Sequence, residues 1–232
     1  MNATTKTKWP SQRQCLQLVS DSVLYALVLV LFWPFRADLV LIFTWFSAYP
    51  YFLLTKRRSM LKKLLLSTIF GCIWMTVAKN QIRYEQDFIA IGGFQLFVMF
   101  GWALGLMFAH LIYSHFREYV QPHNNFQERL LFSVIYCALL ILTETISYHV
   151  FGIHNVIAQG HVGVPFFDCL HAPRWMQFSY FLTGPVYFVC CCFLWPPCNT
   201  RHTAGVPPKL GGCSWKHATE HGGKHYQGHL PI

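Results

Sequence analysis

The sequence predicts an all-α integral membrane protein: a single bundle of about six transmembrane helices, with a long apolar outer loop capping the bundle. Of the 232 residues, 54% are hydrophobic and only 12% are charged, whereas a soluble domain carries about 25% charged residues. The apolar residues form long runs rather than the short alternating segments of β-strands. Runs near 20 residues match the hydrocarbon core of a bilayer.

Six apolar runs are candidates for these helices. They cover residues 17–34, 38–54, 64–78, 88–113, 130–153 and 175–195. The first contains Asp21 and ends in FWPFRAD rather than in a small-residue cleavage site, so we interpret it as a retained helix and not as a signal peptide. The third, LLLSTIFGCIWMTVA, is the shortest. Its flanks MLKK and KNQ could snorkel to complete a span, and a five-helix bundle without it is the alternative.

Composition divides the chain into three segments. Residues 1–16 form an N-terminal segment, residues 17–196 the transmembrane domain, and residues 197–232 a flexible tail rich in Gly, Pro and His. Regularly spaced histidines in the tail could bind a metal ion weakly. They are His217, His221, His225 and His229.

The distribution of Lys and Arg predicts that both termini are cytoplasmic. With six helices and an internal N-terminus, four of the 18 basic side chains lie outside, namely Arg36, Lys79, Arg83 and Arg174. This bias fits the positive-inside rule. The net charge of +9 is therefore a topology signal, and nucleic acid is not expected as a partner. Membrane lipids are expected partners, together with a small apolar substrate.

Two further patterns allow more than one interpretation. Gly101 and Gly105 in GWALG fit close small-xxx-small packing of helices, which is the favoured interpretation. The Phe- and Met-rich helix around them could instead shape a cavity for a large apolar ligand. The cysteines 190–192 could be palmitoylated or could pack as small apolar side chains.

Glu144 is the main candidate for chemistry inside the membrane. If the fifth helix begins at Leu130 on the inner side, the helical rise places Glu144 about 20 Å along it, in the outer half of the bilayer. A carboxyl group there either stays neutral or pairs with a cation or a hydrogen-bond donor, and ionisable groups in spans mark functional sites by default. Glu144, Ser147, Tyr148 and Phe151 share one helical face. Alternatively, a neutral Glu144 bonded to Gln95 or Tyr148 links two helices.

The loop at 154–173, HNVIAQGHVGVPFFDCLHAP, adds polar groups at the same outer end. It is longer than most connections, and VGVPFF is too apolar for a disordered tether, so we predict a re-entrant or interfacial loop. Asp21 and His110 are expected near the inner interface and receive little weight. The candidate site residues are Glu144, His149, His154, Asp168, His171 and Arg174.

Two kinds of chemistry fit these residues. In acid/base catalysis, Glu144 or His171 moves a proton, and Asp168 orients His171. Arg174 binds an anionic group or Asp168, and His149 carries protons or acts as a ligand. In metal chemistry, N, O and S ligands of the kinds that zinc and iron accept would hold an ion, although HExxH and paired CxxC motifs are lacking. Those ligands would come from His149, His154, His161, His171, Asp168 and Cys169.

The leading hypothesis is an enzyme that acts on a lipid-phase substrate such as an isoprenoid, sterol, quinone or lipid. A proton-coupled transporter or channel with Glu144 as its relay is the alternative. It ranks second because the inner half of the helices offers few polar groups for a continuous path. A structural or assembly subunit, with polar groups serving only packing, is the third hypothesis.

Overall fold

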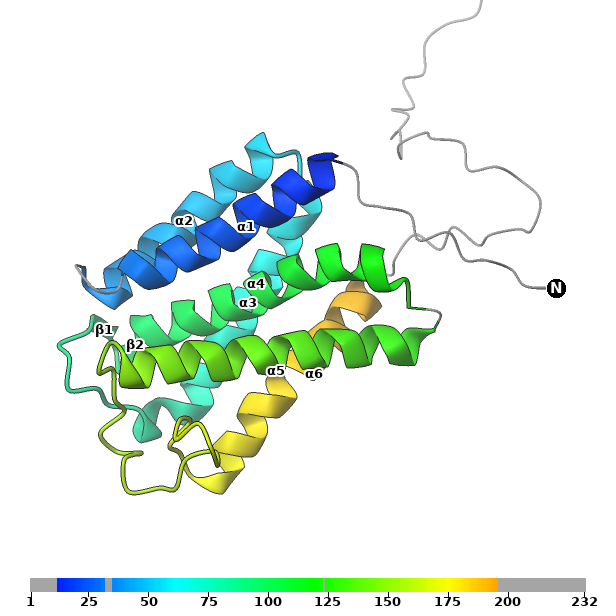
Figure 1. Ribbon diagram of the computed structural model, residues 1–232. Helices are drawn as coiled ribbons and strands as arrows, with labels where there is room; N and C mark the ends of the chain where they lie inside the picture. Colours follow the sequence, from blue (N-terminus) through cyan, green and yellow to red (C-terminus); the bar gives the residue numbers. More distant parts are fainter. Residues whose placement is uncertain (1–11, 32–34, 123, 196–232) are drawn as a thin grey trace, which may run out of the picture. The chain divides into compact units, whose positions relative to one another are not determined.

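The computed structural model of the protein describes residues 12–31, 35–122 and 124–195, which form six α-helices (Figure 1). The helices are α1 (Gln12–Leu31), α2 (Ala37–Leu54), α3 (Arg58–Ala78), α4 (Leu96–Val120), α5 (Asn125–His149) and α6 (Arg174–Leu194). A 3₁₀ turn, η1 (Lys79–Gln81), follows α3, and a hairpin of β1 (Ala90–Ile91) and β2 (Phe94–Gln95) precedes α4. The predicted tail and its four histidines lie outside the described residues.

Five of the helices, α2 to α6, are long and apolar enough to cross a membrane. The apolar part of α1 is shorter within the described residues, Cys15–Val28. The third apolar run gives a full-length helix because α3 begins at Arg58, so that the basic residues of MLKK belong to the helix itself. These lengths and compositions indicate a multi-pass helical membrane protein.

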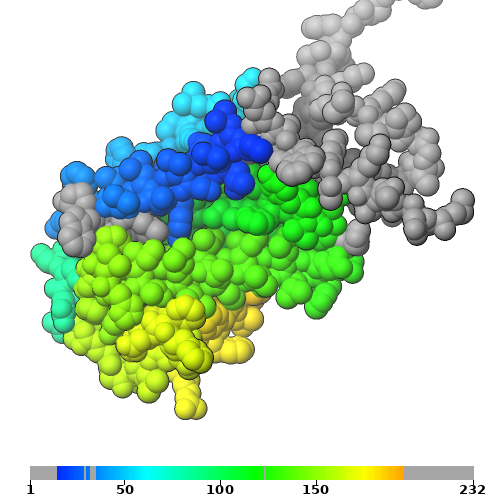
Figure 2. Space-filling view, in the orientation of Figure 1, coloured from blue at the N-terminus to red at the C-terminus, as the bar shows by residue number. Residues whose placement is uncertain are grey.

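The helix surfaces carry large apolar side chains that are mostly exposed. Phe43 and Phe46 on α2 are exposed, and so are Phe178 and Phe193 on α6. Hydrocarbon solvates such side chains without the penalty that water imposes. Figure 2 shows one face of the bundle, with α1 in blue, α5 in yellow-green and α4 in green between them.

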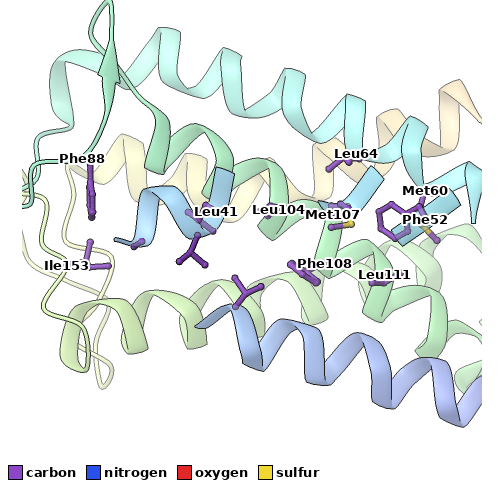
Figure 3. Close-up of a cluster of buried hydrophobic side chains, with 14 residues drawn as sticks. Leu41, Phe52, Met60, Leu64, Phe88, Leu104, Met107, Phe108, Leu111 and Ile153 are labelled. Carbon is purple, nitrogen blue, oxygen red and sulfur yellow. The ribbon is translucent and has the colours of Figure 1, made fainter. Parts of the chain in front are cut away.

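Helix α4 is the centre of the bundle, because it contacts each of the other five helices. The others surround it in the order α1, α2, α3, α6 and α5, each touching the next. A hydrogen bond of 2.5 Å between the hydroxyls of Tyr25 and Thr143 links α5 back to α1. A core cluster follows α4 along its length, from Phe88 and Ile153 at one end to Phe52 and Met60 at the other (Figure 3).

The two ends of the bundle differ in structure. One end, called the loop end below, carries residues 79–95 and 150–173, and the opposite end carries the short α2–α3 and α4–α5 connections. At the loop end the buried Asp38 carboxylate accepts hydrogen bonds from the backbone N–H of Ile89, at 2.8 Å, and from the Arg36 guanidinium, at 2.9 Å. Arg36 also donates to the carbonyl of Asp87. The start of α2 therefore holds the segment that leads into the hairpin.

The fourth helix begins at Leu96, whereas the sequence predicted a start at residue 88. Gly92 and Gly93, with φ of 59° and 83°, form a two-residue turn that pairs β1 with β2. Such positive φ angles suit a tight hairpin and are unfavourable for other residue types. Gln95 consequently ends the hairpin, and its buried Oε1 has no hydrogen-bond partner among the described residues. The predicted bond between Gln95 and Glu144 is not formed.

Candidate functional site

A cavity of about 170 Å³ lies beside α4, where Gly101 and Gly105 remove side chains from the bundle. A methyl group added at Gly101 would first meet Leu41, at 3.7 Å, and one added at Gly105 would meet nothing within 4 Å. The expectation of close helix packing at this pair was therefore wrong. The glycines instead hollow this face of the helix.

Apolar side chains form most of the cavity wall. The aromatic part of that wall includes Phe97 and Trp102 on α4, and the aliphatic part includes Leu139 and Leu140 on α5. Ile153, from the loop after α5, closes the wall at the loop end. A hollow with mostly apolar walls and a few converging polar groups is the usual form of a small-molecule site.

Glu144 is the acidic side chain that lines this cavity, together with Ser147 and Tyr148 from the same predicted face. Phe151, the fourth predicted member of that face, lies beyond the end of α5 at His149 and is not part of the cavity wall. It keeps exposed surface, and no hydrogen bond or ion pair links it to another described residue. The hydroxyls of Tyr84, Tyr136 and Tyr180 lie within electrostatic reach of its carboxyl group. The predicted bond to Tyr148, one turn further along the same helix, is also absent. The carboxyl group is therefore available to a molecule in the cavity.

Tyr84 brings a phenol to the cavity from the segment between η1 and β1. Its ring packs edge-on against Phe88 and Phe97. Burial raises the pKa of Tyr84 well above its ordinary value, and the nearby Glu144 and Tyr180 raise it further. The phenol thus keeps its proton at neutral pH and can donate a hydrogen bond into the cavity.

The tyrosines on α5 and α6 are fixed by close packing of these two helices. The Tyr136 hydroxyl donates to the carbonyl of Tyr180 across 2.5 Å. The Tyr136 ring lies directly over Gly184, where any side chain would overlap it. The Tyr180 ring stacks on Trp102 of α4, with centroids 5.4 Å apart. These contacts set the positions of the rings before any ligand arrives.

His171 enters the cavity wall from the loop that precedes α6. Its Nδ1 lies 2.9 Å from the carbonyl oxygen of His161, and its Nε2 lies 3.1 Å from the carbonyl oxygen of Asp168. Carbonyl oxygens only accept, so both ring nitrogens can donate at once only when the imidazole is protonated. The Asp168 carboxylate, 3.2 Å from Nε2, is placed to balance that charge.

The other predicted site residues are distributed around the mouth of the bundle. His149 is exposed, and its Nε2 lies 3.0 Å from the carbonyl of Phe167. His154 packs edge-on against Tyr148, with ring centroids 4.2 Å apart, and its buried Nδ1 has no hydrogen-bond partner among the described residues. Arg174 is exposed at the start of α6, and no ion pair between it and Asp168 is formed.

The predicted metal ligands do not converge. Among the described residues, no three His, Cys, Asp or Glu side chains are placed to hold a metal ion. Asp168 and His171 form one pair, whereas Cys169 is buried and His149 bonds elsewhere. The geometry of the loop end therefore gives the metal hypothesis no ligand set.

The loop before α6 combines strain with exposed apolar surface. Phe166, Asp168 and Leu170 have φ of 71°, 44° and 57°, a region that costs energy for residues other than glycine. Phe166 is fully exposed, whereas the Cys169 side chain is buried beneath it. Burial raises the pKa of the Cys169 thiol, Thr145 opposes that shift by a hydrogen bond, and the carboxyl groups of Glu144 and Asp168 add to it. The thiol therefore stays protonated at neutral pH.

A second polar cluster lies toward the opposite end, at a residue to which the sequence gave little weight. The Asp21 carboxylate accepts hydrogen bonds from the Tyr51 hydroxyl, at 2.5 Å, and from the Arg57 guanidinium, at 2.8 Å. The Nε2 of His115 lies 2.6 Å from the same carboxylate. The Asp21 side chain is completely buried among these partners. An acid inside an apolar run was the available signal.

His110 is enclosed within the bundle. It is 5% exposed and lies among four aromatic rings, those of Tyr113, Phe132, Tyr187 and Phe188. Its Nδ1 has no hydrogen-bond partner among the described residues. Helix α4 is central, so even residues near its far end are enclosed by neighbours.

The Cys190–Cys192 segment packs in the core between α4, α5 and α6. Cys191 is buried in a cluster with Tyr187 and Phe188, and its two neighbours are partly buried against the same cluster. The packing interpretation accounts for these contacts. Comparisons of the chain with protein-family models, curated proteins and solved structures found no match.

Proposed function

We propose that the protein is a membrane enzyme that acts on a lipid-phase substrate held in the α4 cavity, with Glu144 as its general acid or base. The observation that carries this proposal is the position of Glu144: a carboxyl group without a hydrogen-bond or ion-pair partner among the described residues, on the wall of an apolar cavity. A polar group that served only to hold helices together would be bonded to another helix. Glu144 is instead free to exchange a proton with a bound molecule.

Several groups around Glu144 support proton chemistry. Tyr84 and Tyr180 line the same cavity and can donate hydrogen bonds to a substrate. In this proposal, His171 supplies or accepts a proton, and the pair that it forms with Asp168 holds its ring in place. Exposed Arg174 would bind an anionic group of a lipid or substrate at the mouth. An enclosed, apolar surrounding strengthens such interactions relative to water.

The distribution of Lys and Arg orients the proposal in the membrane. By the positive-inside rule, the loop end faces the exoplasmic side and both termini face the cytoplasm. The cavity would then lie in the outer half of the bilayer, and the fully exposed Phe166 would rest in the interface. A substrate could reach the site from the outer leaflet without leaving the hydrocarbon phase.

The test is a comparison of lipid extracts from cells that express the wild-type chain or Glu144→Gln. We expect a product in the wild-type extract and accumulation of its precursor in the variant, because the amide keeps the shape of the side chain but cannot carry the proton. Glu85→Gln is the matched control, because Glu85 is exposed on the loop before the hairpin. Indistinguishable wild-type and Glu144→Gln extracts, with equal amounts of folded protein, would overturn the proposal.

Proton-coupled transport is the second candidate, and the Asp21 cluster favours it. Asp21 lies one helical turn before Tyr25 on α1, and Tyr25 bonds to Thr143 on the cavity wall. Polar groups thus extend from the cavity toward the opposite end, which the sequence did not indicate. Reconstituted vesicles with a pH-sensitive dye inside test this candidate. Proton flux that is lost in both Glu144→Gln and Asp21→Asn, in vesicles that contain equal amounts of folded protein, would support it, and the absence of flux in the wild-type protein would overturn it.

A further inference from the structure

We propose that the α4 cavity binds the positively charged end, an amine or quaternary ammonium group, of a lipid-phase molecule between Glu144 and the surrounding aromatic rings. The inference rests on the proposed function, because it names the class of ligand that the same cavity takes. It adds a requirement for charge that an apolar cavity alone would not impose.

The first argument is the missing counter-charge. The described residues that line the cavity include Glu144 but neither Lys nor Arg. An ionised carboxylate in apolar surroundings is very unfavourable unless an opposite charge accompanies it. A cationic ligand would supply that charge, so its binding would be coupled to the ionised form of Glu144.

His171 lines the cavity too, but its ring nitrogens are already engaged. Both of its ring nitrogens face backbone carbonyls, those of His161 and Asp168. The Asp168 carboxylate lies 3.2 Å from Nε2. No described contact joins His171 to Glu144, so the imidazole does not occupy the place that a ligand cation would take.

The second argument is the aromatic content of the wall around the carboxyl group. Tyr84, Tyr148, Tyr180 and Trp102 all line the cavity. Aromatic faces attract cations, and several rings around one site form the cages that bind quaternary ammonium groups. These rings are held by other rings, Tyr180 on Trp102 and Tyr84 on Phe97. A pre-set cage loses little conformational entropy when the ligand enters.

The third argument is the apolar remainder of the cavity. Beyond the carboxyl group, the wall includes Gly101, Gly105 and Leu139. A cavity of about 170 Å³ is similar in size to engineered cavities that hold one benzene ring. It therefore accommodates a small charged head and the first carbons of a chain, and the rest of an alkyl chain would extend beyond it.

The test uses three probes with one decyl chain and different heads: decyltrimethylammonium, decylamine and decanol. Binding to the full chain in nanodiscs is measured by calorimetry, with protein-free nanodiscs to correct for partition into lipid. We expect both cations to bind at least about tenfold more tightly than the alcohol. Equal affinity of all three probes for the wild-type protein would overturn the inference.

Two variants separate charge from space. In Glu144→Gln we expect the preference for cations to vanish while decanol binds as it does to the wild type, which also reports an intact fold. In Gly105→Leu the cavity is filled, and all three probes should lose affinity. A cation preference that persists in Glu144→Gln would exclude Glu144 as the recognition group and overturn the inference. Glu85→Gln is the matched control and should behave as wild type.

The binding experiment and the lipid extracts fail independently. A cation preference without any difference between the lipid extracts would support a ligand-binding protein and overturn the proposed enzyme activity. A difference between the extracts without a cation preference would support the enzyme activity and overturn the inference of a cationic ligand.

Discussion

The Nε2 of His115 lies 2.6 Å from the Asp21 carboxylate, and both side chains are buried. This contact joins α1 to the central helix α4, and Arg57 at the start of α3 completes it. The apolar part of α1 is short within the described residues. The ion pair therefore adds a polar link to the apolar contacts of the first helix.

Asp21→Asn should destabilise the protein strongly. Removal of one partner leaves Arg57 buried without its counter-charge, and breaking a buried ion pair in this way costs about 3–5 kcal/mol. The midpoint of thermal unfolding in detergent measures the effect. Asp87→Asn is the control, because it makes the same change at an exposed carboxylate. Equal midpoints for the two variants would contradict the assigned role of Asp21.

Two glycines should respond in opposite ways to the same substitution. Alanine at Gly184 would overlap the Tyr136 ring, and overpacking of this kind costs about 1–3 kcal/mol. Alanine at Gly105 enters open space and favours the helix by about 0.5–1 kcal/mol. Thermal unfolding of the two variants should therefore shift down and up respectively. A loss of stability in Gly105→Ala would show that the cavity wall is more tightly packed than described.

Tyr84 should give the folded protein a sensitivity to alkaline pH. Its raised pKa means that the unfolded chain loses the phenolic proton, near pH ~10, before the folded chain does. The stabilising contribution is thus complete below that pH and is lost as the pH rises beyond it. We expect the unfolding midpoint of Tyr84→Phe to fall less than that of the wild type above pH ~10. Tyr49→Phe, at an exposed tyrosine, is the control: its unfolding midpoint should fall with pH as steeply as that of the wild type.

His171→Phe should loosen the loop before α6. The new ring can keep the stacking on Tyr148, whose centroid lies 4.7 Å from that of His171. It cannot donate to the carbonyls of His161 and Asp168. Hydrogen exchange at the amides of Val164 and Asp168, which bond within the loop, should accelerate about tenfold or more.

The control for this variant is His161→Phe, because His161 contributes its backbone carbonyl to the contact. Its substitution should leave the exchange rates of the loop unchanged. Faster exchange throughout α5 and α6 in His171→Phe would instead indicate a general loss of packing.

The helices could be predicted where polar or helix-breaking residues bound an apolar run. The predicted runs 38–54 and 175–195 nearly coincide with α2 and α6. The start of α4 could not be placed by composition, because the hairpin before it is as apolar as the helix. Gly92 and Gly93 were the local signal for that turn. Hydropathy reports which residues avoid water and not how their backbone folds.

The candidate site was predictable only within single elements. Helical periodicity placed Glu144, Ser147, Tyr148 and Phe151 on one face; the first three line the cavity, whereas the helix ends before Phe151. The Asp21 cluster required three different helices and a connection, and their relative rotation is set by packing. The hollow at Gly105 likewise exists because no described side chain of a neighbouring helix reaches this position. Sequence spacing carries neither kind of information.

If the hollow beside α4 binds a ligand as we propose, it also links the lifetime of the protein to that ligand. A bundle that leaves space at Gly101 and Gly105 forgoes contacts that a filled core would have. A molecule that binds there restores them and adds its binding free energy to the stability of the fold. Membrane quality control removes the less stable empty form faster than the occupied one. Cells that are starved of the ligand should therefore accumulate less of the protein at unchanged rates of synthesis.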